Sequence, residues 1–220
     1  MISQSMEDYL KAIFQLGKLE KQVSTSALAE YLKVAPASVT NMCKKLAELN
    51  LVVYEPYRGV TFTLAGQKMV LEIVRHHRLI ELYLAEALGV PWDRVHEEAE
   101  KWEHVISEDL EERMAAVLGD PKFDPHGAPI PTRSGYVHEQ DSNRLVDMET
   151  GDNMIVVEVD DRDPELLRYL GELGIYPGTK ITLLVRAPFN GPLTLSNGDE
   201  EYNLGYQAAK SIRVTRRKSE

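Results

Sequence analysis

This chain lacks the features that would mark it as secreted, membrane-embedded or redox-active. It has one cysteine among its 220 residues, which excludes a disulfide framework and a thiolate cluster and is typical of a reducing compartment. It has no N-terminal apolar segment of the signal-peptide kind and no apolar run of about 18 residues. We therefore expect a cytoplasmic protein that does not contact the membrane.

Basic residues are also in the minority, since 25 Lys and Arg stand against 35 Asp and Glu, for a formal net charge of −10. The imbalance is uneven along the chain. Residues 1–64 carry seven basic and six acidic residues, whereas residues 65–139 carry eight and fifteen and residues 140–220 carry ten and fourteen. Because nucleic-acid binding depends on a local basic face, the net acidity does not exclude DNA as a partner.

The segment 95–105 is rich in glutamate and histidine. If it is helical, four potential metal ligands share one stripe: His96, Glu100, Glu103 and His104. An apolar set lies directly beside that stripe: Ala99, Trp102, Ile106 and Leu110. Imidazoles and carboxylates at the margin of a core face can hold a divalent cation. The alternative is a solvated acidic helix with a stray histidine.

The first third of the chain predicts three short helices followed by a β-hairpin. An amphipathic helix opens near Ser5, a second can be capped by Ser24 or Thr25, and Pro36 suits the first turn of a third. Residues 51–54 and 60–64 predict two antiparallel strands around a turn at 55–59. This order is that of a winged helix-turn-helix.

A helical region follows over residues 64–118, with a break at 89–91, and its excess of apolar residues suggests a dimer interface. Short β runs at the C-terminal end predict a small β-barrel: 155–159, 180–185, 192–195 and 211–214. The expected fold is mainly α with a C-terminal β-barrel. The expected divisions are a DNA-binding domain (1–64), a helical metal-binding and dimerisation domain (65–140), a linker (141–152) and an SH3-like domain (153–220).

Several segments together resemble one family. They are 5–9 (SMEDY), 34–40 (VAPASVT), 77–81 (HRLIE), 95–105 (VHEEAEKWEHV), 124–131 (DPHGAPIP) and the region from Leu167 to Gly178 onward. With these motifs the chain resembles the DtxR/MntR family of metal-dependent transcriptional repressors over essentially its whole length. The tail is similar to the SH3-like, FeoA-like domain of longer members. The resemblance implies a homodimer that binds a double-stranded DNA operator.

The resemblance also implies two metal sites. The ligands that it implies for the main regulatory site are Asp8, Glu100, Glu103 and His104. It puts His77, Glu81 and His96 at or next to a second site. A further ligand would come from the proline-rich loop, as Asp124 or His126, and another from the C-terminal domain, among Asp160, Asp161 and Asp163.

Two departures from the family pattern bear on the choice of metal. Iron-sensing members have methionine and cysteine in the main site, where this chain has Asp8 and Glu100. Short manganese regulators have a second acid one turn after the first-helix aspartate, where this chain has Lys11. Three carboxylates and one histidine suit Mn²⁺, which prefers hard oxygen ligands. Fe²⁺ is the alternative, and Zn²⁺ or Cd²⁺ can also bind in vitro.

The expected mechanism is electrostatic. Without a cation the acidic groups of the main site repel one another, and a divalent ion would tie the first helix to the dimerisation domain. In a two-fold dimer this sets two recognition helices about 34 Å apart. The residues expected to contact DNA are Ala37, Ser38, Thr40, Asn41, Lys44 and Lys45 on the recognition helix and Tyr57 and Arg58 on the wing.

Two other classes of function compete with this interpretation. A carboxylate-bridged metalloenzyme would need a Glu-x-x-His motif on each of two helices, and the chain has one, at Glu100 to Glu103-His104. A zinc hydrolase would need His-Glu-x-x-His, which is absent. We therefore expect a regulator and not an enzyme. A DNA-binding module with a purely structural metal remains open on sequence alone.

Overall fold

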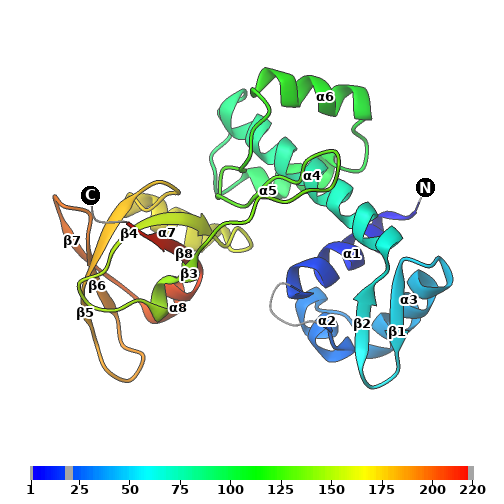
Figure 1. Cartoon of the computed structure of the whole chain (residues 1–220), viewed down its shortest axis with the longest axis horizontal. Coiled ribbons are helices and arrows are strands. Elements are labelled where there is room, and N and C mark those ends of the chain that lie inside the picture. Colours follow the sequence, from blue (N-terminus) through cyan, green and yellow to red (C-terminus); the bar gives the residue numbers. More distant parts are fainter. Residues whose placement is uncertain (1, 18–21, 218–220) are drawn as a thin grey trace. The chain divides into compact units, whose positions relative to one another are not determined.

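The computed structural model describes residues 2–17 and 22–217, and the chain divides into two compact units. The first unit comprises residues 1–76 and 131–136, and the second comprises residues 77–130 and 137–220. Helix α4 (Leu64–Glu86) contributes to both, because the division falls between His76 and His77 (Figure 1). In the part of the chain that is described, no helix combines the length and the apolar character needed to cross a membrane.

Three helices and a hairpin build the first unit, as the sequence predicts. They are α1 (Gln4–Gly17), α2 (Thr25–Leu32), α3 (Pro36–Glu48), β1 (Val52–Glu55) and β2 (Gly59–Phe62). Ser24 caps α2 by accepting a hydrogen bond from the backbone of Ala27 at 3.1 Å, and Pro36 stands in the first turn of α3. Strands β1 and β2 pair antiparallel. The predicted winged helix-turn-helix is therefore confirmed.

The helical part of the second unit consists of the later turns of α4 with α5 (Val95–Trp102) and α6 (Glu108–Val117). Its apolar core is Leu79, Ile80, Leu84, Val95, Ala99, Met114 and Ala115. Leu79 and Ile80 are fully buried, and they lie between the charged residues that α4 turns toward the interior. The same helix therefore supplies both the apolar core and buried polar groups.

The prediction that one continuous helix runs across Glu103, His104 and Leu110 is wrong in its second half. α5 ends at Trp102, and the chain turns before α6 begins. The side chain of Ser107 accepts a hydrogen bond from the backbone of Leu110, and acidic residues fill the first turn of α6. A strong N-cap followed by acids favours a new helix start over continuation of the old one. Trp102, expected in the core, is 38% exposed.

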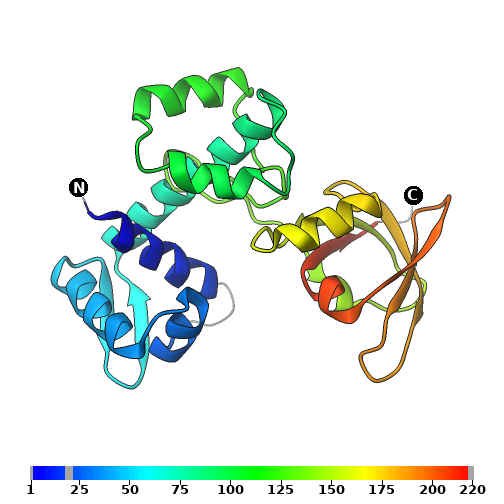
Figure 2. The same ribbon diagram turned by 180° about the vertical axis from the view of Figure 1, so that it is seen from behind.

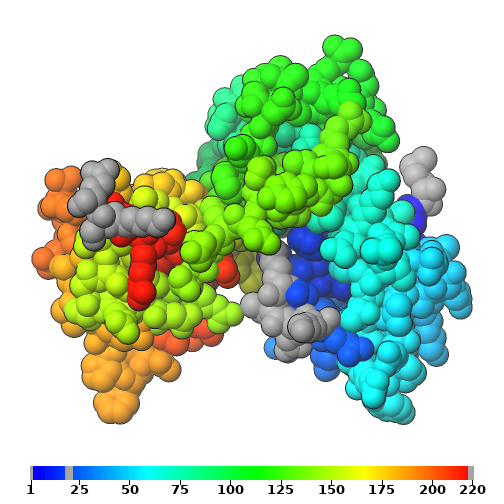
Figure 3. Space-filling view, in the orientation of Figure 1, coloured from blue at the N-terminus to red at the C-terminus, as the bar shows by residue number. Residues whose placement is uncertain are grey.

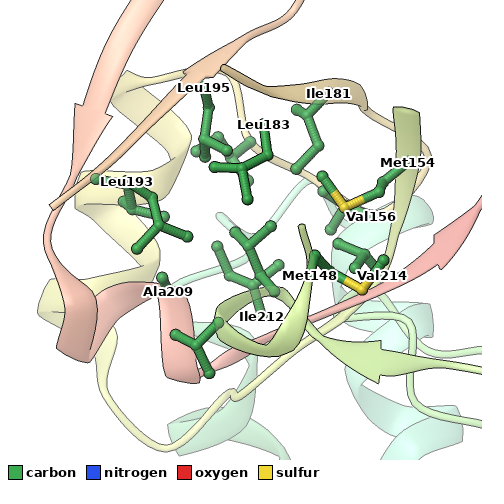
Figure 4. Close-up of a cluster of buried hydrophobic side chains, with 14 of the residues drawn as sticks. Met148, Met154, Val156, Ile181, Leu183, Leu193, Leu195, Ala209, Ile212 and Val214 are labelled. Carbon is green, nitrogen blue, oxygen red and sulfur yellow. The ribbon is translucent and has the colours of Figure 1, made fainter. Parts of the chain in front are cut away.

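An antiparallel sheet forms the C-terminal part of the second unit, with strand order β3-β8-β4-β5-β6-β7. Its strands are β3 (Asn143–Arg144), β4 (Asn153–Val159), β5 (Lys180–Arg186), β6 (Leu193–Ser196), β7 (Glu201–Leu204) and β8 (Ile212–Arg216). Figure 2 shows α7 (Pro164–Glu172) and α8 (Tyr206–Lys210) on the near side of these strands. Apolar side chains from the strands and from Met148 fill the interior (Figure 4).

The sheet is not closed, so the prediction of a β-barrel is wrong. Strands β3 and β7 are the two edges, and among the described strands neither pairs with the other. β3 has only two residues before the chain enters a 3-10 turn at Leu145–Asp147, which leaves too few backbone groups to close a ladder. Residues 143–148, expected as linker, instead belong to this domain, since Leu145 and Met148 are buried in its core.

Candidate metal centre

Helix α4 carries two ionisable side chains one turn apart, His77 and Glu81, and both are buried. The i, i+4 spacing puts them on one face of the helix. His77 lies between two carboxylates: its Nδ1 is 2.5 Å from Glu103 Oε2 and its Nε2 is 3.0 Å from Glu81 Oε1. His96 Nδ1, from α5, lies 2.9 Å from the same Glu81 oxygen. The predicted residues of two chain segments are therefore brought together here.

The end of α5 positions the other predicted acids. Glu100 is in the last turn of the helix, and Glu103 and His104 follow in the turn after Trp102. Glu100, Glu103 and His104 each offer a ligand atom, and these atoms lie within 4.8 Å of one another. The side chain of Glu103 is 1% exposed and that of His104 14%, whereas that of Glu100 is 37% exposed. Asp8 lies on α1 in the first unit.

The proline-rich loop holds Asp124 and His126 by a local turn. Asp124 Oδ1 accepts hydrogen bonds from the backbone N–H groups of His126 and Ala128, both at 2.9 Å. Arg78 joins this loop to α4: its Nη1 donates to the Pro129 carbonyl at 2.5 Å, and its Nε lies 3.5 Å from Asp124 Oδ2. The loop carboxylate is therefore fixed by the backbone on one oxygen and faces α4 with the other.

His126 is held in one tautomer. Its Nε2 lies 2.7 Å from the carbonyl oxygen of Trp92, which can only accept a hydrogen bond, so Nε2 carries the proton. In the neutral ring Nδ1 then keeps its lone pair, which is the form that binds a metal ion. The indole of Trp92 also stacks on this imidazole, with ring centroids 5.7 Å apart.

Glu81, Asp124 and His126 form a buried cluster, in which each residue offers a ligand atom within 4.8 Å of those of the other two. Each also has a buried atom without a hydrogen-bond partner in the described part of the chain: Glu81 Oε2, Asp124 Oδ2 and His126 Nδ1. A buried polar atom without a partner costs about 1–3 kcal/mol. Carboxylate oxygens and an imidazole nitrogen are donors that could hold a divalent cation.

The three aspartates at the end of β4 have different surroundings. Asp161 belongs to a cluster with Glu81 and His96, and its Oδ2 lies 3.8 Å from His96 Nδ1. The carboxylate of Asp160 pairs with Arg162. Asp163 caps α7, because its Oδ1 accepts hydrogen bonds from backbone N–H groups in the first turn of that helix. Among these three candidates, Asp161 is the one that faces the buried cluster.

The charges in this cluster shift one another's pKa values. Burial would lower the pKa of His77, but the charge of Glu81 and hydrogen bonds to both carboxylates outweigh it and raise the pKa to about 10. Burial would raise the pKa of Glu81, but the charge and hydrogen bond of His77 hold it well below its usual value. Burial, followed by the charge of Glu81, raises the pKa of Asp124 to about 7. A cluster that crowds carboxylates in this way favours a cation.

Sequence reasoning missed two residues that position this centre, Arg78 and Trp92. Arg78 stands inside the segment that carries the family resemblance, and its position next to His77 was the available signal. Trp92 is not among the predicted site residues, because it acts through its backbone carbonyl, which leaves no mark in a sequence.

The recognition helix presents a polar face. Of the residues predicted to contact DNA, Ala37, Ser38, Asn41, Lys44 and Lys45 are exposed on α3, and Thr40 is half-buried with its hydroxyl on the carbonyl of Pro36. Tyr57, at the tip of the hairpin, is fully exposed with φ of 67°. Arg58 is exposed and pairs with Glu55 at 3.1 Å. In Figure 3 this hairpin, in cyan, forms part of the outer surface of the first unit.

Three family models match the chain over most of its length. The N-terminal DNA-binding domain of iron-dependent repressors matches residues 1–60, and their metal-binding and dimerisation domain matches residues 63–132. The FeoA domain matches residues 143–216.

Curated relatives and solved structures agree with these models. The iron-dependent repressor IdeR of Mycobacterium tuberculosis strain H37Rv is 30% identical over 220 residues, which cover 94% of this chain and 95% of the relative. A manganese-dependent transcriptional repressor in complex with manganese is 37% identical with a TM-score of 0.87, covering 96% of this chain and 99% of that one. The Cd²⁺-bound structure of ScaR is 33% identical with a TM-score of 0.82, covering 96% and 98%.

Replacing Gly127 with alanine should destabilise the second unit. Gly127 has φ of 87°, and a Cβ there would stand 1.9 Å from the carbonyl oxygen of Val157 in β4. Gly127→Ala should therefore lower the free energy of unfolding by about 2 kcal/mol or more. Gly119→Ala is the matched control, because Gly119 has φ of 71° but open space around it. Urea unfolding followed by tryptophan fluorescence measures both, and equal losses would contradict the close approach to β4.

Proposed function

Because this chain belongs to the iron-dependent repressor (DtxR) family and is a metal-dependent transcriptional repressor, we propose that Mn²⁺ is the ion that activates it for operator binding. The observation that carries this proposal is the character of the donors. In the clusters of the second unit they are carboxylate oxygens and imidazole nitrogens, and the single cysteine, Cys43, is buried in the core of the first unit. Such hard donors suit Mn²⁺.

The main site would be formed by Asp8, Glu100, Glu103 and His104. The last three offer convergent ligand atoms in the second unit. Asp8 would come from α1 of the DNA-binding domain, where the resemblance puts a family ligand. Backbone carbonyls or water would complete the coordination. A site with ligands from both domains is suited to regulation, because its occupancy can bias the DNA-binding geometry.

The second site would be formed by Glu81, Asp124, His126 and Asp161. Support comes from the three buried ligand atoms without hydrogen-bond partners and from the tautomer that Trp92 imposes on His126. Asp161, in the C-terminal domain, supports this site as well, because its charge helps to raise the pKa of Asp124. Burial is the largest cause of that raised pKa, and the charge of Glu81 is the next. His77 and His96 would stand beside this site, and Asp160 and Asp163 would remain outside it.

Regulation would follow from charge. A divalent cation supplies the positive charge that offsets the mutual repulsion of the main-site carboxylates. Asp8 would then be held against the turn that carries Glu103 and His104, which orders α1 and, with it, the recognition helix α3. The family's dimerisation domain would present two such helices about 34 Å apart. Exposed apolar residues support a dimer surface on the helical part, among them Val105 (82%), Leu110 (45%) and Val117 (71%).

DNA contact would be made by α3 and the hairpin. Ser38, Thr40 and Asn41 are short polar residues suited to base edges or phosphates, with Ala37 beside them. Lys44 and Lys45 suit phosphates. At the wing, Tyr57 and Arg58 would reach the sugar-phosphate backbone or the minor groove. Their exposure on one small domain supports this assignment.

Fe²⁺ is the second candidate for the activating ion, because the curated relatives include iron-dependent repressors. The two ions are close in size, so discrimination would rest on ligand type and coordination geometry. Zn²⁺ and Cd²⁺ would also bind, and solved structures of ScaR are described with each of them.

Operator binding should require the main-site carboxylates. Glu100→Gln removes one negative ligand, and we expect it to raise the Mn²⁺ concentration needed for half-maximal DNA binding at least tenfold. Glu97→Gln is the matched control, because Glu97 lies on the same helix but pairs with Lys101 at the surface. Fluorescence anisotropy with a labelled operator, titrated with Mn²⁺ at fixed salt, measures both. A Glu100→Gln curve that overlays the wild type would rule out Glu100 as a ligand.

The choice of metal should follow ligand softness. Replacing Asp8 by methionine and Glu100 by cysteine substitutes a thioether and a thiolate for two hard donors. The double variant should shift activation from Mn²⁺ toward Fe²⁺. Anaerobic titrations of DNA binding with both ions give the ratio of half-activating concentrations. A ratio unchanged from that of the wild type would place selectivity outside these two positions.

Binding to DNA phosphates should appear in the salt dependence. Lys44→Ala or Lys45→Ala should weaken binding to all sequences and lower the salt slope by about one for each phosphate that a subunit no longer neutralises. Asn41→Ala should instead cost roughly 1–3 kcal/mol at one base pair. Binding measured across a salt series with saturating Mn²⁺ distinguishes the two effects. Normal slopes in both lysine variants would mean that α3 is not the recognition helix.

A further inference from the structure

One tryptophan joins the helical part of the second unit to the sheet domain (residues 143–216). Trp92 lies in the turn between α4 and α5, yet its side chain packs against the apolar core of the sheet domain. Among the described residues outside the sheet domain, it is the one apolar side chain that does so. A partly buried indole that contacts the core of another domain is suited to docking that domain.

The indole has neighbours both in the sheet domain and in the proline-rich loop. Its ring centroid lies 4.7 Å from that of Tyr176 and 5.7 Å from that of His126. A Cβ built at Gly171 of α7 would stand 3.3 Å from Trp92 Nε1 and 2.9 Å from the hydroxyl oxygen of Tyr176. That hydroxyl donates to the Gly171 carbonyl at 3.3 Å. The missing side chain at position 171 therefore lets the indole approach α7 closely.

An ion pair stands beside the indole. Arg168 precedes Gly171 by one turn on α7, and its Nε lies 3.7 Å from Oδ2 of Asp93, the residue that follows Trp92. The side chain of Asp93 is only 14% exposed, so its carboxylate is better shielded from water than that of a surface pair. Opposite charges at the edge of an apolar contact fix the orientation of the two partners.

We propose that five residues of this contact form a clasp that keeps the sheet domain docked whether or not a metal ion is bound: Trp92, Asp93, Arg168, Gly171 and Tyr176. None of the five belongs to a candidate ligand cluster in the described part of the chain. Their contacts are apolar packing, a hydrogen bond and an ion pair between protein groups. The clasp therefore needs no cation to form.

The clasp has a consequence for the second metal site proposed above. Asp161 is the candidate ligand from the sheet domain, and its Oδ2 lies 3.8 Å from His96 Nδ1. In a docked domain Asp161 stands at the cluster before an ion arrives, so binding does not carry the cost of ordering the domain. Trp92 is therefore a positioning residue for Asp161. The docking is independent of the proposed metal sites, whereas this consequence rests on the second of them.

The backbone amide of Val159 measures docking directly. Its N–H donates to the carbonyl of His126 at 2.9 Å, from the sheet domain to the proline-rich loop. The N–H of Val156 is an internal reference, because it donates to the Thr179 carbonyl at 2.9 Å within the sheet domain. Hydrogen exchange of both amides can be followed in the full-length protein by mass spectrometry with residue resolution. In the wild type, we expect Val159 to exchange as slowly in excess EDTA as with saturating Mn²⁺.

Replacing the indole should release the domain. In EDTA, Trp92→Ala should speed exchange at Val159 about tenfold or more and leave Val156 unchanged, because the sheet domain undocks without unfolding. Trp92→Phe keeps an aromatic ring and should restore most of the protection. Tyr169→Ala is the matched control, because Tyr169 also lies on α7 but its hydroxyl faces the Asn203 carbonyl within the sheet domain. This control should leave exchange at Val159 unchanged.

Charge reversal gives a second route, which serves if Trp92→Ala does not fold. Arg168→Glu puts two negative charges side by side and should speed exchange at Val159 in EDTA. Adding Asp93→Lys to the same chain restores an opposite pair and should slow the exchange again. Rescue by the double reversal identifies the pair itself, because a merely structural role of either side chain would make the two losses accumulate.

Mn²⁺ titration by calorimetry tests the consequence for the metal site. Trp92→Ala should raise the Mn²⁺ concentration needed for the second binding event about fivefold or more, because the ion must then order the sheet domain as well. Trp92→Phe should lie close to the wild type.

Two results would overturn the clasp. Protection of Val159 that appears only with Mn²⁺ would mean that the ion docks the domain. Protection that survives in EDTA in both Trp92→Ala and Arg168→Glu would mean that the backbone contacts alone dock it. A failure of the proposed second site looks different: Asp161→Ala would then leave Mn²⁺ binding unchanged, while exchange at Val159 in EDTA would still decide for or against the clasp.

Discussion

The carboxylate of Glu81 is fully buried, and the arrangement of the second unit follows from that burial. Removing a carboxylate from water costs several kcal/mol unless donors and cations compensate for the lost hydration. At one oxygen of Glu81, hydrogen bonds with His77 and His96 compensate for the lost hydration. The other oxygen has no hydrogen-bond partner among the described residues. A second buried acid, Asp124, offers a ligand atom within 4.8 Å of one from Glu81, and two backbone N–H groups and the nearby guanidinium of Arg78 stabilise Asp124. Side chains from α4, α5 and the proline-rich loop are therefore arranged around one buried charge.

Local chemistry made much of the fold predictable. Ser24 and Pro36 mark helix starts by mechanisms that act within a few residues, so α2 and α3 follow from the sequence alone. The end of α5 does not, because the apolar period continues past Trp102 and the break depends on Ser107 competing as a cap. Strand β7, Glu201–Leu204, was missed because three of its four residues are partly or fully exposed and show little apolar alternation. Closure of the sheet is a property of edge pairing, which no single segment encodes.

The candidate site was predictable in its residue types but not in its pairings. Helical spacing alone puts His77 and Glu81 on one face. Which oxygen of Glu81 faces which nitrogen depends on how α5 and the loop pack against α4, and the spacing of residues along one helix does not record that packing. The choice among three neighbouring aspartates depends on equally local facts: Asp160 has an arginine partner and Asp163 has a helix to cap, so Asp161 is left to face His96.

The C-terminal domain is joined to this centre by more than a single aspartate. The backbone N–H of Val159 in β4 donates to the His126 carbonyl at 2.9 Å, and Gly127 lies against Val157 of the same strand. Trp92, whose carbonyl sets the tautomer of His126, also packs its ring against Tyr176, with centroids 4.7 Å apart. A shift of the sheet domain would therefore move both the loop that carries His126 and the residue that orients its ring. The domain therefore bears on the geometry of the candidate ligands through backbone and aromatic contacts as well as through Asp161.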